Sequence, residues 1–379
     1  MLVTRKVPAL IIRVLIYFYL FNFVRVQWCG IVSDYFLAGN GVKQGGVLSP
    51  VLFCLYIDGL LIALSRAGVG CFLGSNFVGA LAYADDIVIL APTASALRIL
   101  LSVCDNYAKE YSISFNAGKS KCLVILPSNR RFLNDLVKRC TFHVGDNPIE
   151  YVDSFVHLGH IITNQLIDDD DILKGRNNFV GQVNNVLCFF SKLKSCIIYR
   201  LFQSYCMSMY GCELWVLSNK HISELCVAWR KSLRRVWRLP NTTHCYLLPL
   251  LSQCLPLEDE ICKRSLNFIR DCLCNSSGLV SAIANYGVFY GRYNSFLGHN
   301  ALFCVNKYNV NICDIVGGST NVNYVVRRHV FGLVDDCQFQ SVNFLRELVL
   351  LRDKDLVLSN DVYFSREELE LIICNICND

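Results

Sequence analysis

Two adjacent aspartates interrupt an apolar stretch, and this anomaly constrains the fold more than any other feature of the sequence. Asp85 and Asp86 are flanked by residues 79–82 and 87–90, whose apolar side chains predict a buried β-hairpin with the aspartates at its turn. Unpaired carboxylates in such a place are costly unless a cation offsets their charge. Hard oxygen ligands on a strand turn suit Mg²⁺, and two such ions about 4 Å apart serve in-line phosphoryl transfer. The simpler alternative is a solvent-facing turn.

Apolar periodicity predicts helices and hairpins in the first 165 residues, followed by a long, mostly helical part. Ser49 is a good N-cap, and Pro50 suits the first position of a helix. We expect helices over residues 8–21, 50–65 and 94–111, and hairpins over residues 24–38, 80–90 and 151–163.

Residues 41–53, GVKQGGVLSPVLF, precede the Tyr83-Ala84-Asp85-Asp86 sequence by about 40 positions. Together the two segments resemble the palm of a reverse transcriptase, in the variant of non-LTR (LINE-type) retrotransposons. In that family the YxDD hairpin is the polymerase metal site, and the first segment lines the template and incoming-nucleotide pocket. The resemblance implies that Asp85 and Asp86 bind Mg²⁺ in a two-ion site. It also implies an RNA template, a DNA primer and deoxynucleoside triphosphates as partners.

The residues of the first segment suit that pocket physically. Gly45 and Gly46 remove side chains where a nucleic-acid backbone must come close, and their N–H groups are free to meet it. Gln44 offers an amide that can reach sugar or base edges, and Lys43 can contact phosphate. A glycine turn before an ordinary helix would explain the glycines but not the whole string. The resemblance adds Tyr83 to this nucleotide-binding group.

Two later motifs follow in the family's order. Asn116–Lys121, NAGKSK, resembles the motif that holds a lysine near the nucleotide phosphates, where a cation can neutralise the leaving pyrophosphate. This implies a catalytic role for Lys119, with Lys121 as the fallback, and a nucleotide-binding role for Asn116. A solvated loop lysine is the simpler interpretation.

The other motif is His157-Leu158-Gly159-His160, which resembles the primer grip, although His157 stands where the family commonly has tyrosine. The resemblance therefore implies that His157, Leu158 and Gly159 contact the primer. Metal ligation by His157 and His160 is the rival interpretation, but the sequence offers no further ligand cluster nearby.

The net charge of +5 conceals a basic middle and an acidic tail. Residues 174–238 hold 11 Lys and Arg against 2 Glu, a balance of +9, whereas residues 351–379 hold 3 basic and 7 acidic side chains, a balance of −4. The basic middle resembles the helical thumb that follows such palms. We expect it to contact the backbone of a primer–template duplex. The alternative interpretation is an exposed basic helix face that is packed by its tryptophans. The expected contact residues are Lys231, Arg234, Arg235 and Arg238, interleaved with Trp229 and Trp237.

The expected fold class is α+β: a partial palm with an antiparallel sheet and helices, then a helical thumb and a helical C-terminal region. The expected division assigns residues 1–127 to the partial palm and residues 128–165 to the palm end with the primer-grip-like hairpin. Residues 166–285 are the thumb-like region, and residues 286–379 have no motif that assigns a role.

In this family an aspartate on an opening palm strand precedes the helix expected at residues 8–21. Residues 1–7 contain no acid, and neither Asp34 nor Asp58 is a credible substitute. We therefore expect an N-terminally truncated RNA-directed DNA polymerase with little or no activity alone. The alternative is a non-catalytic nucleic-acid-binding remnant that uses the basic thumb.

The 21 cysteines fall singly on apolar stretches, as at Cys54, Cys71 and Cys188, and their odd number fits poorly with a disulfide framework. No cleavable signal peptide is visible. These features predict free thiols and an intracellular protein, nuclear or cytoplasmic and not secreted. Arg13 and Asn22 break the most apolar stretch, which is then too short to span a bilayer, so we expect no membrane partner.

Overall fold

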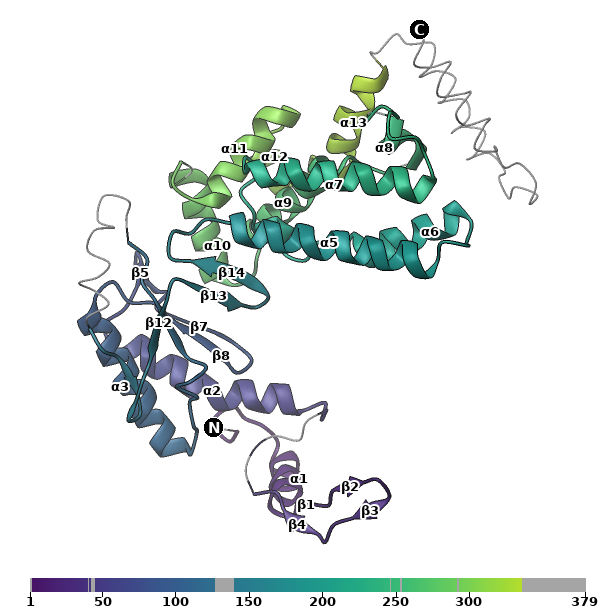
Figure 1. Ribbon diagram of the computed structural model, residues 1–379. Helices are drawn as coiled ribbons and strands as arrows, with labels where there is room; N and C mark the ends of the chain where they lie inside the picture. The colour runs from purple at the N-terminus through teal and green to yellow at the C-terminus, as the bar shows by residue number, and fades with distance from the viewer. Residues whose placement is uncertain are drawn as a thin grey trace. The chain divides into compact units, whose positions relative to one another are not determined.

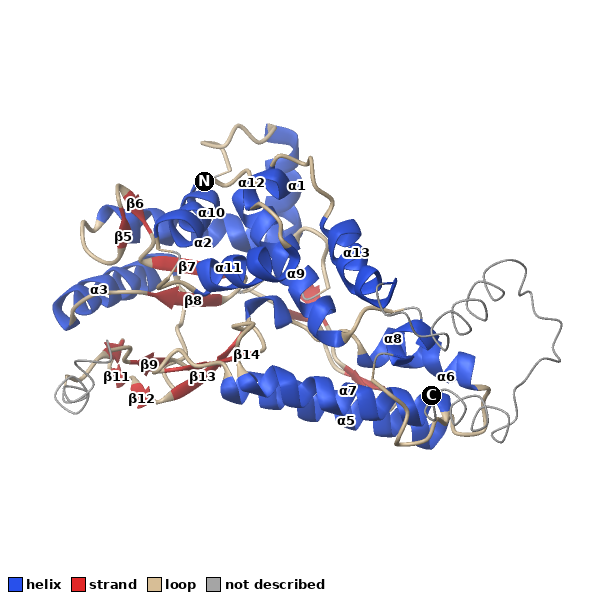
Figure 2. Ribbon diagram, turned by 90° about the horizontal axis from the view of Figure 1, so that it is seen from above, coloured by secondary structure: helices blue, strands red, loops and turns tan. Residues whose placement is uncertain are grey.

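The computed structural model describes residues 2–39, 41, 45–126, 140–245, 247–252, 254–291 and 293–335. The chain divides into two compact units, Met1–Val152 and Asp153–Asp379 (Figure 1), which we call unit 1 and unit 2. Helices and small two-stranded sheets alternate in unit 1, and helices dominate unit 2 (Figure 2). The mixed character predicted from the sequence is confirmed. The finer division into palm and thumb stays a prediction.

The three helices that the structure describes in unit 1 lie where the periodicity predicts them: α1 (Ala9–Leu20), α2 (Ser49–Arg66) and α3 (Ala94–Tyr111). Local chemistry explains their limits. Pro50 lies in the first turn of α2, and the Thr93 hydroxyl caps α3 by accepting a hydrogen bond from the Ala96 N–H at 3.2 Å.

The strands of unit 1 are short, and each one described pairs with a single partner. The hairpin expected at residues 24–38 consists of two separate ladders, while the hairpin expected at residues 80–90 forms as a single one. The pairs are β1 (Phe23–Val24) with β4 (Phe36–Leu37), β2 (Gln27–Trp28) with β3 (Ile31–Val32), β5 (Phe72–Leu73) with β6 (Asn76–Phe77), β7 (Ala80–Tyr83) with β8 (Asp86–Ile89), β10 (His143–Val144) with β11 (Asn147–Pro148), all antiparallel, and β9 (Lys121–Leu123) with β12 (Glu150–Val152) in parallel.

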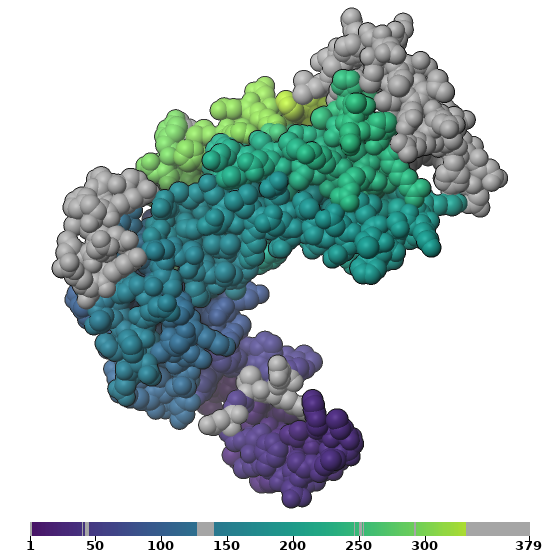
Figure 3. All heavy atoms as spheres, in the orientation of Figure 1, coloured from purple at the N-terminus to yellow at the C-terminus, as the bar shows by residue number. Residues whose placement is uncertain are grey.

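A small apolar cluster joins α2, α3 and one face of the β7–β8 hairpin. Leu60 and Leu64 of α2 pack with Leu100 of α3, and each of the three has no exposed surface. By contrast, none of the described side chains of α1 is buried. In Figure 3 the purple segment that holds α1 and β1–β4 forms a lobe of its own within unit 1.

The prediction that the β7–β8 hairpin is buried was wrong. Leu81 is 46% exposed and Tyr83 is 67% exposed. The reason is that this hairpin is a two-stranded sheet, so only one of its faces packs on the helices and neither outer edge is covered by a described strand.

Helix α2 is, within the described ranges, the one helix long and apolar enough to span a membrane, judged by length and composition alone. Its buried residues Ile57, Leu60 and Leu64 follow one helical stripe. Through this stripe α2 packs into the apolar cluster of unit 1.

Unit 2 opens with a hairpin, β13 (Ser154–His157) and β14 (His160–Thr163), which confirms the one expected at residues 151–163. The following part is helical, as predicted. Its α-helices are α5 (Asp169–Phe189), α6 (Ser195–Leu201), α7 (Lys220–Trp237), α8 (Leu247–Ser252), α9 (Leu257–Leu273), α10 (Gly278–Asn285), α11 (Phe296–Tyr308), α12 (Ile312–Val316) and α13 (Val322–Asp335). The described residues of unit 2 also form two π-helical turns, η2 (Phe202–Cys206) and η4 (Tyr286–Tyr290), and a 3₁₀ turn, η3 (Cys212–Leu214).

The core of unit 2 is larger than that of unit 1. Helices α5 and α7 lie side by side (Figures 1 and 2), and their Phe179, Leu225 and Trp229 belong to one buried cluster with Ile261 of α9, which is 1% exposed. The aromatic ring of Trp229 therefore belongs to the core and not to the basic surface of α7.

The cysteines of the described ranges are free thiols, as predicted. The positions chosen as examples of small core residues were wrong, because Cys54 and Cys188 are exposed. Burial falls on others, and it raises the pKa of Cys206 to about 11 and that of Cys226 to about 12. Such thiols are inert fillers of the core.

Candidate functional site

The turn between β7 and β8 presents the two aspartates to solvent. Tyr83 pairs with Asp86 across the hairpin, which leaves Ala84 and Asp85 as the turn residues, and Ala84 has a φ of +51°. All four side chains are exposed. The burial that suggested a compensating cation is thus absent, and that electrostatic argument was wrong. The donor set still fits Mg²⁺, which favours carboxylates and keeps several waters.

The described part of the chain contains no group of three or more His, Cys, Asp and Glu residues that could hold a metal ion. Asp58, one of the nearest other acids in sequence, pairs with Arg5. Asp34 is exposed on the connection between β3 and β4. Neither joins Asp85 and Asp86 in a ligand set, so these two aspartates supply one side of a two-ion site at most.

The segment before α2 is described only in part. Lys43 and Gln44 lie outside the described residues. Gly45 has a φ of +79°, a backbone conformation that favours glycine, and a Cβ built on it would meet no atom within 4 Å. The requirement for glycine at position 45 is therefore conformational. The carbonyl of Gly46 accepts a hydrogen bond from the Ser49 N–H at 3.1 Å, just before α2.

The NAGKSK motif folds as a tight turn. The Asn116 side chain accepts a hydrogen bond from the Lys119 N–H at 3.0 Å, which fixes the turn that presents Lys119 to solvent. The ammonium of Lys121 instead lies 2.5 Å from Glu150, across the parallel β9–β12 pair. Lys119 makes no ion pair with any residue that the structure describes, so it remains the better candidate for phosphate contact.

The HLGH motif is a two-residue hairpin turn. Leu158 has a φ of +47° and Gly159 a φ of +87°, and His157 stands opposite His160 in the register. Among the described residues, no group of three or more possible metal ligands gathers around the two histidines. The Nδ1 atom of His160 lies 3.0 Å from a carboxylate oxygen of Asp171 on α5.

Asp171 is the buried centre of a polar network that the sequence did not reveal. One carboxylate oxygen also accepts a hydrogen bond from the Trp215 indole at 2.8 Å, and the other accepts one from the Ile161 N–H at 2.9 Å. Burial alone would raise the pKa of Asp171, but the hydrogen bonds from Trp215, Ile161 and His160 outweigh burial and hold it below its usual value. The network joins β14, α5 and the segment before α7.

Asp168 and Asp169, in the same acidic run, also hold the start of α5 against the segment before α7. Asp168 accepts a hydrogen bond from the Val216 N–H at 2.7 Å, and Asp169 accepts one from the Asn219 amide at 2.8 Å. Burial raises the pKa of Asp168. Carboxylates at the N-terminal end of α5 also interact favourably with the positive end of the helix dipole.

Gly211 is required by the same network. It has a φ of +76°, and a Cβ built on it would lie 1.8 Å from Cε1 of His160. The ring of the preceding residue, Tyr210, stacks on His160 with centroids 5.4 Å apart.

The basic residues of α7 are mostly engaged inside unit 2. Arg234 donates twice to the Thr243 carbonyl, at 3.1 and 2.6 Å, and Arg235 donates to Asn184 at 2.8 Å. Arg238 donates to the Ser191 carbonyl at 2.8 Å. Lys231 is exposed and makes no hydrogen bond within the described ranges. These contacts favour packing for the arginines and leave Lys231 as the strongest candidate for a nucleic-acid contact.

Comparison with known proteins agrees with the motifs. The family model described as "Reverse transcriptase (RNA-dependent DNA polymerase)" matches residues 4–162. The chain is 31% identical over 131 residues to the Pol polyprotein of the type-2 retrotransposable element R2DM of Drosophila melanogaster, a match that covers 34% of this chain and 12% of that protein. It is 32% identical over 123 residues to the R2 Pol polyprotein of Nasonia vitripennis, covering 32% of this chain and 12% of that protein. The chain thus spans about an eighth of these relatives. Residues 4–162 belong to the reverse transcriptase family, in its non-LTR retrotransposon form.

Proposed function

We propose that the chain is part of the RNA-directed DNA polymerase of a retrotransposon, in which Asp85 and Asp86 contribute to template-directed nucleotidyl transfer. The observation that carries the proposal is the reverse transcriptase match over residues 4–162, which includes an Asp-Asp turn whose carboxylates are open to solvent. By analogy, the partners are an RNA template, a DNA primer and deoxynucleoside triphosphates.

Each candidate residue has a stated part in this proposal. Asp85 and Asp86 would hold Mg²⁺, which supplies charge stabilisation for the transferring phosphoryl group. The ammonium of Lys119 would approach the phosphates of the incoming nucleotide and neutralise the leaving pyrophosphate. The remaining roles fall to two groups. Lys43, Gln44, Gly45, Gly46, Tyr83 and Asn116 would contact template or nucleotide, and His157, Leu158 and Gly159 would contact the primer.

We further propose that these 379 residues alone do not polymerise. Bridging two ions needs carboxylate oxygens from two strands, and the described residues bring no third acid to the β7–β8 turn. The four-part domain division and an intracellular location, nuclear or cytoplasmic, belong to the same proposal.

Metal binding tests the role of the aspartates. We expect the chain to bind Mn²⁺, used as a paramagnetic probe for the Mg²⁺ site, and to enhance water-proton relaxation. The Asp85→Asn/Asp86→Asn double variant should lose this enhancement because the amides carry no charge. Asp34→Asn removes a similarly exposed carboxylate of unit 1 and should retain it. Equal binding by the double variant would contradict the assignment.

Primer extension on an RNA template with Mg²⁺ then tests the inactivity. The chain is expected to add no more nucleotides than its Asp85→Ala variant. Robust nucleotide incorporation that disappears in Asp85→Ala would support the proposed polymerase function and contradict the proposal that the metal site is incomplete.

A charge reversal separates the two interpretations of the basic helix. We expect Lys231→Glu to weaken binding to an RNA–DNA hybrid and to lower the salt dependence by about one counterion, with an unchanged melting temperature. Arg234→Glu should instead lower the melting temperature, because the Thr243 carbonyl loses both of its Arg234 donors. Lys109→Glu, an exposed change on α3, is the control for net charge. If Lys231→Glu and Lys109→Glu bind the RNA–DNA hybrid with the same affinity, the basic face of α7 is a packed helix surface and not a nucleic-acid contact.

A further inference from the structure

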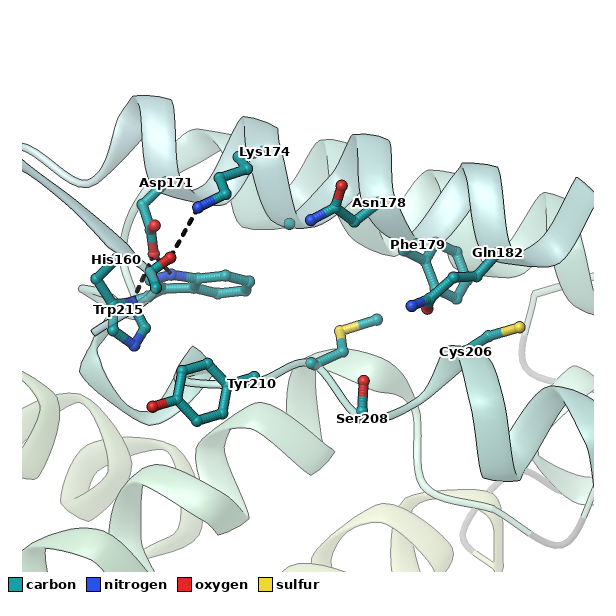
Figure 4. Close-up of a pocket in the computed structure, with 13 residues that line it drawn as sticks. His160, Asp171, Lys174, Asn178, Phe179, Gln182, Cys206, Ser208, Tyr210 and Trp215 are labelled. Carbon is teal, nitrogen blue, oxygen red and sulfur yellow. Dashed lines mark hydrogen bonds and ion pairs between the residues drawn. The ribbon is translucent and has the colours of Figure 1, made fainter. Parts of the chain in front are cut away.

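A pocket of about 210 Å³ lies in unit 2 between α5 and the segment of residues 206–210 (Figure 4). Lys174, Asn178 and Gln182 extend into it from α5, one helical turn apart. Ser208 and Tyr210 lie across from them, and the buried ring of Phe179 forms part of the lining. The pocket is also lined by Gly159 and His160 of the HLGH turn. Its other lining residues have no role in the polymerase site proposed above.

The walls of the pocket are held in place by contacts within unit 2. The Arg264 guanidinium donates to the Ser208 carbonyl at 2.7 Å and to the Met207 carbonyl at 3.0 Å, which fixes the segment opposite α5. Gly175 allows the Trp215 ring to approach α5, since a Cβ there would lie 3.0 Å from that ring. A pocket built in this way is preformed and needs little ordering on binding.

The polar side chains of the pocket can still form hydrogen bonds to a ligand. The Asn178 and Gln182 amides make no hydrogen bond to any residue of the described ranges, and both side chains are exposed. Lys174 donates to the Gly159 carbonyl at 2.8 Å, so the ammonium is oriented while two of its three donors stay free. Asp171, the acid that lines the pocket, is already engaged by Trp215 and His160.

The remaining element is a flat aromatic surface. One face of Tyr210 stacks on His160, and the side chain is 73% exposed. A cavity of 210 Å³ is smaller than the roughly 300–1,000 Å³ typical of sites for drug-sized ligands, so it suits one ring system and excludes a whole nucleoside triphosphate. An amide pair, an ammonium and a stacking ring match a base edge, a phosphate and a base face.

We propose that this pocket receives one unstacked base of a single-stranded nucleic acid. Tyr210 provides the stacking surface, Asn178 and Gln182 bind the base edge, and Lys174 contacts the adjacent phosphate. The inference rests on the proposed polymerase function, which brings single-stranded nucleic acid to the chain, but it concerns residues that the polymerase motifs do not include.

The test uses a short RNA single strand with one fluorescent 2-aminopurine among abasic sugars, titrated with the full 379-residue chain. Fluorescence is expected to fall on binding as the base stacks. The Asn178→Ala/Gln182→Ala double variant should bind about tenfold more weakly, since two neutral hydrogen bonds are lost. Asn177→Ala removes a neighbouring exposed amide that does not line the pocket and should bind like the unmodified chain.

Two results would overturn the inference: a fully abasic strand that binds as tightly as the base-containing one, or a double variant that binds like Asn177→Ala. A separate titration with a primer–template duplex keeps the two proposals apart. Duplex binding without base binding refutes the pocket and leaves the polymerase proposal standing. The opposite outcome is also distinguishable. If the chain binds the base, loses affinity in the double variant, and binds neither duplex nor Mn²⁺, the pocket is supported and the polymerase proposal is refuted.

Discussion

Replacing Gly211 with alanine is expected to lower the free energy of unfolding of unit 2 by about 3–5 kcal/mol. The new methyl group would lie 1.8 Å from the His160 ring, so the ring must move away from Asp171. The φ of +76° adds strain of about 1–2 kcal/mol for any side chain. The larger share comes from the buried Asp171 carboxylate, which loses one of its partners.

Denaturant unfolding followed by circular dichroism measures this change. Gly181→Ala is the matched control, because Gly181 lies inside α5 with an ordinary φ and no atom within 4 Å of its Cβ position. That substitution should stabilise unit 2 by about 0.5–1 kcal/mol through helix propensity. Alanine variants of equal stability at both glycines would show that Gly211 is not packed against His160.

Removing the carboxylate itself is the second large effect. Asp171→Ala leaves the Trp215 indole and the Ile161 N–H without their acceptor, and it removes the partner of His160. Loss of a buried, fully hydrogen-bonded carboxylate is expected to cost about 3–5 kcal/mol. Asp170→Ala, an exposed acid in the same first turn of α5, should cost less than about 1 kcal/mol through the helix dipole alone.

The pH dependence of this difference has a definite sign. The pKa of Asp171 is lowered from its ordinary value of 3.8, so its contribution is complete above that pH and is lost as the pH falls through the lowered pKa. The stability gap between the unmodified chain and Asp171→Ala should therefore narrow below about pH 3.8. A gap that stays constant there would contradict the hydrogen-bonded carboxylate.

Local elements could be predicted because local chemistry decides them. Helix α3 has the predicted limits, since Thr93 caps it and its apolar stripe has helical period. The turn at Leu158 and Gly159 follows from the two-residue spacing between its strands. The family could also be identified, because the two motifs stand in order along the chain.

Burial and long-range pairing could not be predicted in the same way. A continuous apolar run does not say whether a strand has neighbours on both edges, so the exposure of the β7–β8 hairpin was missed. Asp171 meets Trp215 across 44 residues, which no local pattern encodes. One signal was present: Asp171 stands next to Ile172, the first buried apolar residue of α5, and an acid at the margin of an apolar stripe needs partners.

The unequal cores of the two units have a consequence for synthesis. Unit 1 leaves the ribosome before unit 2, with only a small cluster around Leu60 and Leu100 and with an α1 that buries none of its described side chains. At translation rates of about 5–20 residues per second, residues 153–379 take roughly 10–45 s to make. Throughout that time and afterwards, Leu10, Val14 and Tyr17 of α1 present an exposed apolar surface, which would form a binding site for holdase chaperones.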